Sequence, residues 1–348
     1  MYELVKALTE LPGMIGYEEP VQAFLQKRWT PRCQEVWETG VGNVVARVGG
    51  QGPKLLVEAH ADEIGALVAA ISEQGMIWLS SKNPRAGRPG RDVHYLGHPA
   101  VIQTDKGLVE GIFAALSGHV TPPDLRDKPD LRWGDFFVDI GAKSRSEAQE
   151  WGVRVGDGVI WNPTTRRLGH YIVGKAMDDR AALAIMTALL ERLDPAELKY
   201  DLYLASTVQE ELGLVGAYSL ERDVRFDLGI AVDVGLASDV PGVDVRELNV
   251  VLGGGPILVH HDQGVHYDRK LTRALGQVAG EVGIPVQDAV FPRYGSDGQA
   301  MIQGGLPAAL LAFPTRYTHS PYEMLHERDL EQCVDLLHAF LVRPPVRR

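Results

Sequence analysis

Three short segments of the chain are apolar at almost every position, and they restrict the fold more than any other feature. They are residues 55–59, 228–232 and 308–313. A strand with one face in water alternates apolar and polar residues, so these segments predict strands buried on both faces, as in a largely parallel sheet covered by helices. The amphipathic segments that supply the predicted helices include 18–29, 180–193 and 327–341.

A different pattern occupies the middle of the chain. Strand-length apolar runs separated by turns rich in glycine and proline extend over residues 72–162, and no long helical period appears among them until residues 144–151. Such a succession of short strands is typical of a small β-rich domain. The sequence therefore predicts one α/β domain formed by residues 1–71 and 163–348, interrupted by a β-rich insert at residues 72–162.

The charge balance and the cysteine count exclude several classes of protein. With 35 basic and 46 acidic residues the net charge is −11, which disfavours nucleic acid as a partner. The two cysteines, Cys33 and Cys333, are too few for a Cys-based zinc finger or an iron–sulfur cluster, and their scarcity suits a reducing compartment. Because the N-terminus lacks a signal-peptide pattern and no apolar run reaches about 18 residues, we expect a cytoplasmic protein without a membrane segment.

Histidines and carboxylates follow the predicted strands, at the point where each strand ends. Because the carboxyl ends of parallel strands meet at one edge of a sheet, these side chains are expected to lie close together. A further pair of aspartates precedes a predicted helix. The residues are His60 and Asp62 after the first strand, Glu210 and Glu211 after a strand at 202–208, Asp233 after the next strand, His319 after the last, and Asp178 with Asp179 before the helix at 180–193.

Together these side chains have the chemistry of a metal centre. Buried carboxylates this close repel one another unless they are protonated or neutralised by cations. Carboxylate and imidazole ligands without thiolate suit Zn²⁺, Co²⁺ or Mn²⁺. Taken singly, each residue has an ordinary structural explanation, such as Asp178 and Asp179 capping a helix. Their coincidence at one sheet edge favours a site with two divalent ions and a base that is not itself a ligand.

Four segments that contain most of these residues resemble the signatures of the tetrahedral (TET) aminopeptidases, metallopeptidase family forty-two. They are residues 60–65 (HADEIG), 174–180 (GKAMDDR), 208–213 (VQEELG) and 319–324 (HSPYEM). The similarity keeps their order and spacing and extends over essentially the whole chain. The resemblance implies a co-catalytic metalloaminopeptidase that removes N-terminal residues from peptides with two divalent ions, zinc or cobalt, or else manganese.

The resemblance also implies five metal ligands, one orienting carboxylate and one general base. His60 and Asp233 hold one ion, Glu211 and His319 hold the other, and Asp178 bridges both. Asp62 orients His60 from behind. Glu210 is the base that takes a proton from the attacking water and passes it to the leaving amine. The family further implies a cis peptide bond after Asp178.

For the fold, the resemblance implies a zinc-peptidase catalytic domain with a mixed sheet and helices on both faces. It makes the insert a PDZ-like or β-barrel dimerisation domain. In this family such domains help to build hollow tetrahedral dodecamers whose active sites face the cavity. The expected partners are therefore peptide substrates and further copies of the chain, from a dimeric building block up to a dodecamer.

Two stretches depart from the family pattern and leave the preferred N-terminal residue open. The run 294–298 (YGSDG) stands where the family usually has Gly-Gly-Thr-Asp-Ala, so Tyr294 and Gly298 can reshape the substrate pocket. Residues 260–266 (HHDQGVH) carry three histidines, for which we predict a polar surface loop rather than a further metal site.

The ligand set alone also fits other dinuclear hydrolases, namely a carboxypeptidase or an N-deacylase. An endoglucanase, a label given to some members of the family, would need two carboxylates across one bond and usually no metal. A non-catalytic assembly protein would be expected to have lost a ligand or the base, and all are present here. The metal-dependent aminopeptidase is therefore the leading hypothesis.

Overall fold

The computed structural model describes residues 1–81, 95–117, 119–121 and 133–346 of the chain, which divides into two compact units. The first unit is formed by Met1–Asp62 and Thr165–Arg348, and the second by Glu63–Thr164. One unit thus interrupts the other, and the interrupting unit begins at Glu63 rather than at residue 72.

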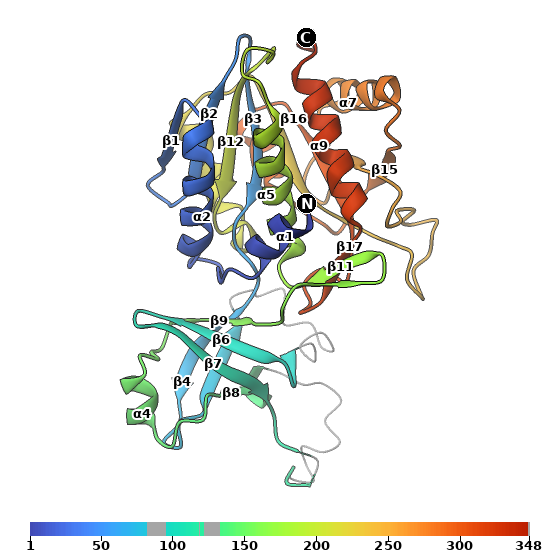
Figure 1. Cartoon of the computed structure of the whole chain (residues 1–348). Helices are drawn as coiled ribbons and strands as arrows, with labels where there is room; N and C mark the ends of the chain where they lie inside the picture. Colours follow the sequence, from blue (N-terminus) through green and yellow to red (C-terminus); the bar gives the residue numbers. More distant parts are fainter. Residues whose placement is uncertain (82–94, 118, 122–132, 347–348) are drawn as a thin grey trace. The chain divides into compact units, whose positions relative to one another are not determined.

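A large mixed sheet forms the centre of the first unit (Figure 1). Its main path is β1 (Glu35–Glu38), β2 (Val44–Gly49), β12 (Asp201–Thr207), β3 (Lys54–His60), β13 (Leu228–Leu236), β16 (Ala308–Arg316), β17 (Glu323–Leu325), β11 (Tyr171–Gly174) and β10 (Arg166–Leu168). Off this path, β14 (Ile257–His261) pairs with β16 and with β15 (Gln287–Val290). The central strands β12, β3, β13 and β16 are parallel, whereas the pairs at both ends of the path are antiparallel.

The apolar segments of the sequence lie at the middle of this sheet. Strands β3, β13 and β16 contain residues 55–59, 228–232 and 308–313, and nearly all of their residues are buried. The last residue of β12, Thr207, pairs with His60, the last residue of β3, so these two parallel strands end side by side. The predicted buried parallel strands are confirmed, and the side chains that follow them emerge at one edge.

Helices cover both faces of the sheet, as expected. One face packs on α1 (Tyr2–Thr9), α2 (Glu19–Trp29), α5 (Met177–Arg192), α7 (Arg269–Val282) and α9 (Glu327–Leu341), and the other packs on α6 (Val215–Asp223) and α8 (Asp297–Gly304). Figure 1 shows α2, α5 and α9 in front of the strands. Of the helices in the described ranges, none is long and apolar enough to cross a membrane.

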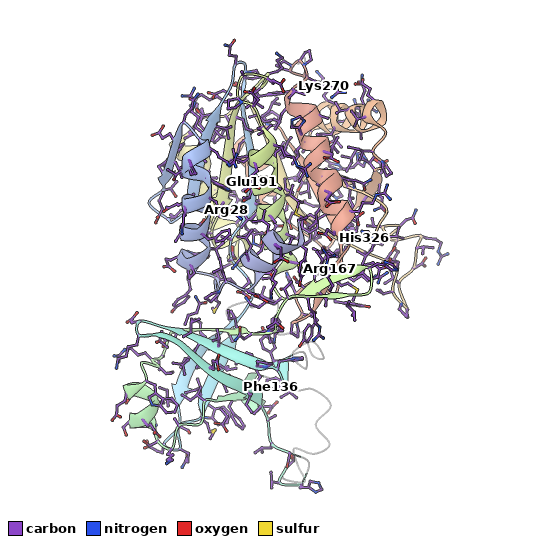
Figure 2. The ribbon with its side chains drawn as sticks, in the orientation of Figure 1. Arg28, Phe136, Arg167, Glu191, Lys270 and His326 are labelled. Carbon is purple, nitrogen blue, oxygen red and sulfur yellow. The ribbon has the colours of Figure 1, made fainter. Side chains whose placement is uncertain are left out.

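Apolar packing holds these layers together. Leu183, Ile185 and Met186 of α5 are completely buried, so this helix contacts its surroundings on most of its sides. At the surface, Arg28 of α2 lies 3.4 Å from Glu191 of α5 (Figure 2). An exposed ion pair of this kind contributes only about 0–1 kcal/mol, so it adds little to the burial of α5.

The second unit is a closed six-stranded barrel with a short helix, α4 (Arg145–Glu150), which confirms the predicted β-rich insert. Around the barrel the strands are β4 (Ala66–Ile71), β5 (Ile77–Ser81), β8 (Phe137–Asp139), β7 (Gly107–Ala114), β6 (Pro99–Thr104) and β9 (Gly158–Trp161). The predicted boundary at residue 72 is too late because β4 hydrogen-bonds to β5 and β9 of the barrel. In the sequence, β4 has the same apolar character as the buried strands of the sheet, which hides the boundary.

Candidate metal centre

The candidate site lies at the carboxyl ends of the central strands, within the first unit. The histidines and carboxylates that follow the predicted strands, and the aspartate pair before the helix, are all found there. His60 ends β3 and Asp62 follows it, Glu210 and Glu211 form the 3₁₀ turn η4 (Glu210–Leu212) after β12, Asp233 lies within β13, His319 follows β16, and Asp178 and Asp179 are in the first turn of α5.

Two groups of potential metal ligands overlap at His60. The donor atoms of His60, Asp178 and Glu211 all lie within 4.8 Å of one another, and so do those of His60, Asp179 and Asp233. The His60 side chain is buried, and its Nε2 is 3.1 Å from Oδ1 of Asp178. Asp179 is the member of these groups to which the sequence assigned no role.

His319 approaches the first group from another direction. Its Nε2 lies 2.9 Å from Oε1 of Glu211 and 3.4 Å from Oδ2 of Asp178. Since Oδ1 of Asp178 faces His60, each oxygen of this carboxylate has a different histidine beside it. This arrangement suits the bridging role that the resemblance predicts for Asp178.

Unusual backbone conformations present several of these side chains. The peptide bond between Asp178 and Asp179 is cis, as the resemblance implies, and neither residue has helical angles. Gln209 and His319 have φ values of 55° and 61°, in the left-handed region that residues other than glycine rarely adopt. Positive φ values of this kind persist only where surrounding contacts hold them in place.

Asp62 is completely buried and links β3 to the turn η4. Its two oxygens accept hydrogen bonds from the backbone N–H groups of Glu210 (3.0 Å) and Glu211 (3.1 Å). Its Oδ1 also lies 3.4 Å from Nδ1 of His60. Burial alone would raise the pKa of Asp62, but the contacts with His60 and the two N–H groups lower it. Asp62 is therefore an ionised carboxylate that fixes both a histidine and the turn.

The other carboxylates of the site crowd one another. Burial, and then the charge of Asp178, raises the pKa of Asp233 well above its ordinary value. Burial also raises the pKa of Glu210 strongly, and the neighbouring charge of Glu211 adds to the effect. The pKa of Asp179 is raised by burial and by Asp233. Without cations, these carboxyl groups therefore hold their protons more strongly than they would in water.

This set of donors fits divalent metal ions. It offers imidazole nitrogens and carboxylate oxygens without thiolate, which suits Zn²⁺, Co²⁺ and Mn²⁺. Within the described residues, Oδ1 of the buried Asp179 has no hydrogen-bond partner. Bound cations would neutralise carboxylates that otherwise repel one another. The cluster is therefore a candidate metal centre.

Glu323 is a further buried carboxylate of the site, and the sequence assigned no role to it although it lies in the segment 319–324. Its side chain accepts the backbone N–H groups of His319 (2.7 Å) and Asp178 (3.0 Å). Burial, and then the charge of Asp178, raises the pKa of Glu323 to about 8. One side chain thus holds the backbones of two candidate ligands, including the residue with positive φ.

Replacing Glu323 by glutamine is expected to weaken metal binding by roughly tenfold, as for other groups that orient metal ligands. The amide oxygen can accept one of the two N–H groups, but the amide nitrogen cannot accept the other. Titration of metal-stripped protein with Co²⁺ measures the affinity. Glu331→Gln, a change at an exposed glutamate of α9, is the matched control and leaves the affinity unchanged. Equal affinity in both variants would show that the ligands hold their positions without Glu323.

Two more buried acids border the site. Glu18 accepts the N–H of Gln209 at 3.1 Å, and burial, followed by the charge of Asp62, raises its pKa to about 7. Asp297 accepts a hydrogen bond from Thr207, and burial raises its pKa to about 6. Asp297 belongs to the run 294–298. Glu18 stands just before α2 and has the pattern of an ordinary helix start, so no signal in the sequence marks it.

The three histidines of residues 260–266 lie outside both groups of potential ligands. His260 Nε2 is 2.6 Å from Oδ1 of Asp288, and His261 donates from Nδ1 to the carbonyl of Val265 at 2.7 Å. The rings of His261 and His266 stack with their centroids 4.3 Å apart. In the part of the chain that the structure describes, none of these histidines joins a cluster of three potential ligands.

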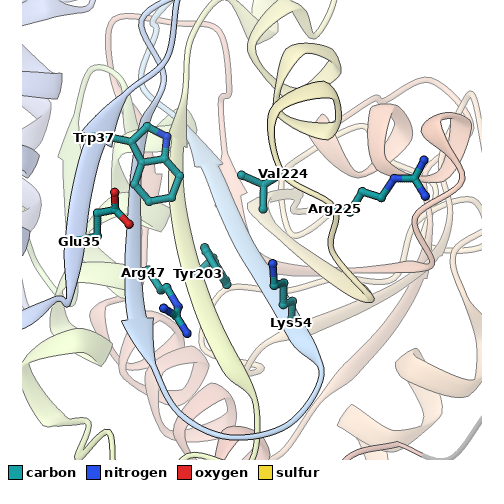
Figure 3. Close-up of a pocket in the computed structure, with 7 residues that line it drawn as sticks. All are labelled: Glu35, Trp37, Arg47, Lys54, Tyr203, Val224 and Arg225. Carbon is teal, nitrogen blue, oxygen red and sulfur yellow. The ribbon is translucent and has the colours of Figure 1, made fainter.

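A separate pocket of about 620 Å³ lies toward the other end of the parallel strands (Figure 3). Lys54 is the first residue of β3 and Tyr203 is near the start of β12, so both stand away from the edge that carries the candidate site. The pocket is also lined by Glu35, Trp37, Arg47, Val224 and Arg225. It contains none of the candidate ligands and is distinct from the metal centre.

Comparison with known sequences gives one consistent result. The model of a family described as M42 glutamyl aminopeptidase matches residues 42–336. The lysyl aminopeptidase of Pyrococcus furiosus is 32% identical over 345 residues, which cover 98% of this chain and 96% of the relative.

Comparison with solved structures agrees. The TET aminopeptidase of the marine sediment archaeon Thaumarchaeota archaeon SCGC AB-539-E09 has a TM-score of 0.90 at 32% identity, covering 98% of this chain and 95% of that one. The TET1 peptidase of Pyrococcus horikoshii, which can assemble into a tetrahedron or a large octahedral shell, has a TM-score of 0.87 at 29% identity, covering 97% and 98%.

Proposed function

Because the chain belongs to the M42 glutamyl aminopeptidase family, and is thus a hydrolase that acts on peptide bonds, we propose that it removes N-terminal residues from peptides with two divalent metal ions and a glutamate base. The observation that carries this proposal is the placement of Asp178. One of its oxygens faces His60, and the other faces His319. A carboxylate between two sets of donors suits a pair of ions roughly 3.5–4 Å apart.

The donors divide into two sets around Asp178. His60 and Asp233 would hold one ion, and Glu211 and His319 would hold the other, with Asp178 shared. When bound, the ions supply a water of lowered pKa and polarise the carbonyl of the scissile bond. Zn²⁺ and Co²⁺ both suit the donor set, and Mn²⁺ is a third candidate.

Glu210 would move the proton during cleavage. It belongs to neither group of potential ligands, and Asp62 fixes its backbone by accepting its N–H. Burial raises the pKa of Glu210 well above its ordinary value, and a glutamate with a raised pKa is a better proton acceptor and donor than a free one. Glu210 would take a proton from the attacking water and deliver it to the amine that leaves.

The two sides of the site differ in exposure, which favours one direction for substrate entry. The His319 side chain is 45% exposed, whereas that of His60 is 2% exposed. A peptide would therefore approach from the side of His319 and Glu211. Its free α-amine, a cation near neutral pH, would lie beside the Glu211 carboxylate, and this contact would restrict cleavage to the first residue.

Self-association through the barrel is part of the proposal. The outer face of β5, β8 and β7 carries the exposed apolar residues Trp78, Leu108 and Ile112. Trp78 pairs with Phe137, and the alternate residues of β8 and β7 continue this face. Exposed apolar surface of this kind is typical of an interaction site. We propose that it joins two copies of the chain, and that such dimers form the dodecamer known for TET peptidases.

A metal-reconstitution assay tests the function. Stripped protein is given Zn²⁺, Co²⁺ or Mn²⁺ together with a panel of aminoacyl substrates and their N-acetylated counterparts. We expect metal-dependent release from the free-amine substrates alone, with the panel ranking the preferred residues. Cleavage of the acetylated substrates would instead identify an N-deacylase or an endopeptidase. Release from the C-terminus of a longer peptide would identify a carboxypeptidase, and hydrolysis of a glucan in the presence of chelator would identify a glycosidase.

A further inference from the structure

Tyr294 brings a phenol hydroxyl to the edge of the candidate metal centre. The hydroxyl oxygen is buried, and in the described part of the chain it makes no hydrogen bond. Asp233 is the carboxylate whose charge acts on it most strongly, followed by Asp178. A buried hydrogen-bond donor that lacks an acceptor destabilises the protein. We therefore expect this hydroxyl to donate a hydrogen bond to a group of the site.

Asp233 is the group best placed to accept a hydrogen bond from the Tyr294 hydroxyl. Its Oδ1 accepts the backbone N–H of Val234 at 2.6 Å. The Tyr294 side chain lies close enough to the Asp233 carboxylate to interact with it by hydrogen bonding, and a deprotonated carboxylate is the form that binds a metal ion. Groups that hydrogen-bond to a metal ligand orient that ligand, and mutating such a group commonly lowers metal affinity by about 10- to 100-fold.

The Tyr294 ring is held in place from several directions. It packs on Phe291 with the ring centroids 5.3 Å apart, and it contacts the apolar cores on both faces of the sheet. Its backbone N–H donates to the Phe291 carbonyl at 3.2 Å, and its own carbonyl accepts the N–H of Gln263 at 2.9 Å. The hydroxyl is therefore fixed by the loop rather than free to choose another partner.

The contact with Gln263 ties this loop to residues 260–266. The completely buried Asp262 accepts hydrogen bonds from the N–H groups of Gly264 (2.7 Å) and Val265 (2.8 Å) and from the hydroxyl of Tyr267 (2.7 Å). The Tyr267 hydroxyl is in turn 2.9 Å from Oγ of Ser296. The two stretches that depart from the family pattern thus form one hydrogen-bonded unit.

Gly298 is part of the same hydrogen-bonded unit, because its lack of a side chain leaves room for the Tyr267 ring. A Cβ atom at this position would lie 2.7 Å from Cε1 of Tyr267 and 3.3 Å from Cβ of Ala231. The alanine usual in the family would therefore collide with the ring that anchors the loop. Gly298 makes room for Tyr267, and Tyr267 holds the run that contains Tyr294.

From this arrangement we propose that Tyr294 is a positioning residue of the metal centre: its hydroxyl donates to the Asp233 carboxylate and fixes that ligand for the ion it shares with His60. Residues 260–267 and 294–298 are the support that brings this donor to the site. The inference rests on the proposed function, because it assigns Tyr294 to one of the two proposed ions.

The experiment compares Tyr294→Phe with Tyr200→Phe. Tyr200 is completely buried, its hydroxyl accepts the N–H of Val346 at 3.3 Å, and its ring stacks on Phe340. It stands just before β12, at the end of that strand opposite the candidate site. Stripped proteins are titrated with Co²⁺ and followed by visible absorption. We expect Tyr294→Phe to lower the affinity for one of two ions by about tenfold and to alter its absorption band. Tyr200→Phe leaves both affinities and both bands as in the unsubstituted chain.

Each result bears on a separate statement. If the unsubstituted chain binds two Co²⁺ ions and Tyr294→Phe binds them with the same affinities and spectrum, the positioning role is wrong and the proposed function stands. If the unsubstituted chain does not bind two ions, the proposed function itself is wrong, and the role of Tyr294 that depends on it is wrong as well. Tyr267→Phe, which loosens the loop but keeps the Tyr294 hydroxyl, provides the second variant, and it is expected to shift the same ion by a smaller factor. Equal melting temperatures of the stripped Tyr294 and Tyr200 variants exclude a general loss of folding.

Discussion

Replacing Glu210 by glutamine is expected to lower kcat by about 10³-fold while both metal ions stay bound. The amide cannot take a proton from the attacking water, and it cannot return one to the leaving amine. The metal ions stay because Glu210 belongs to neither group of potential ligands. Its backbone also keeps its place, since Asp62 accepts the N–H of residue 210 whatever the side chain is.

The measurement combines steady-state kinetics on a free-amine substrate with metal analysis of the same samples. Glu197→Gln, at an exposed glutamate of the loop before β12, is the matched control and keeps the full kcat. A loss of kcat in Glu210→Gln with two ions bound and an unchanged KM assigns the proton transfer to Glu210. Full turnover with both ions bound would instead show that another group is the base, and loss of one ion would make Glu210 a ligand.

The sheet and the clustering of its polar edge could be predicted because both follow from local patterns. The apolar runs at 55–59, 228–232 and 308–313 have no polar face, so they had to become interior strands. Once these strands are parallel, their carboxyl ends share one edge, and the histidines and carboxylates that follow them must meet there. The contact between Glu211 and His319 follows from that rule although 108 residue positions (211 to 319) separate them.

The supporting acids could not be predicted, because their role depends on contacts that no local pattern shows. Glu323 accepts N–H groups of His319 and of Asp178, and the second partner is 145 positions away in the sequence. Glu18 accepts the N–H of Gln209, which has a positive φ and lies 191 positions away in the sequence. Asp179 reads as part of a helix start, yet its angles are not helical and its carboxylate joins the ligand groups.

The start of the insert was missed for a related reason. Residues 66–71 are as apolar as the strands of the large sheet, and the change of pattern becomes visible only at the turns that follow. Hydrogen bonding decides the question, since β4 pairs with β5 and β9 and with no strand of the large sheet in the described residues. Composition reveals a domain boundary only where the strands on its two sides differ in apolar content, and β4 does not differ from the strands of the large sheet in this way.

Removing the metal ions is expected to abolish activity and to make folding stability fall as the pH rises. Burial raises the pKa of Glu323 to about 8, of Glu18 to about 7 and of Asp297 to about 6 in the folded chain. In the unfolded chain these groups titrate near pH 4. Below that pH both states carry the protons, and the contribution to stability is complete.

Above about pH 4 the unfolded state releases its protons while the folded state still holds them, so stability declines until the pH passes the folded pKa of each group. The stripped protein is therefore expected to melt at least roughly 5 °C lower at pH 8.5 than at pH 5.5. Cations in the site oppose this decline, because they favour the ionised carboxylates that high pH produces. The melting temperature of the loaded protein is expected to change less over the same range.

Thermal melts of stripped and loaded protein at pH 5.5, 7 and 8.5 and at constant ionic strength measure both slopes. Glu323→Gln in the stripped state removes the group with the highest of the three pKa values, so its melting temperature is expected to fall less between pH 7 and 8.5. The exposed Glu331→Gln keeps the full slope. A stripped protein that becomes more stable as the pH rises would mean that these carboxyl groups are ionised in the folded chain. The cluster would then be neutralised by partners within the protein, and the electrostatic reason for placing metal ions among these residues would be lost.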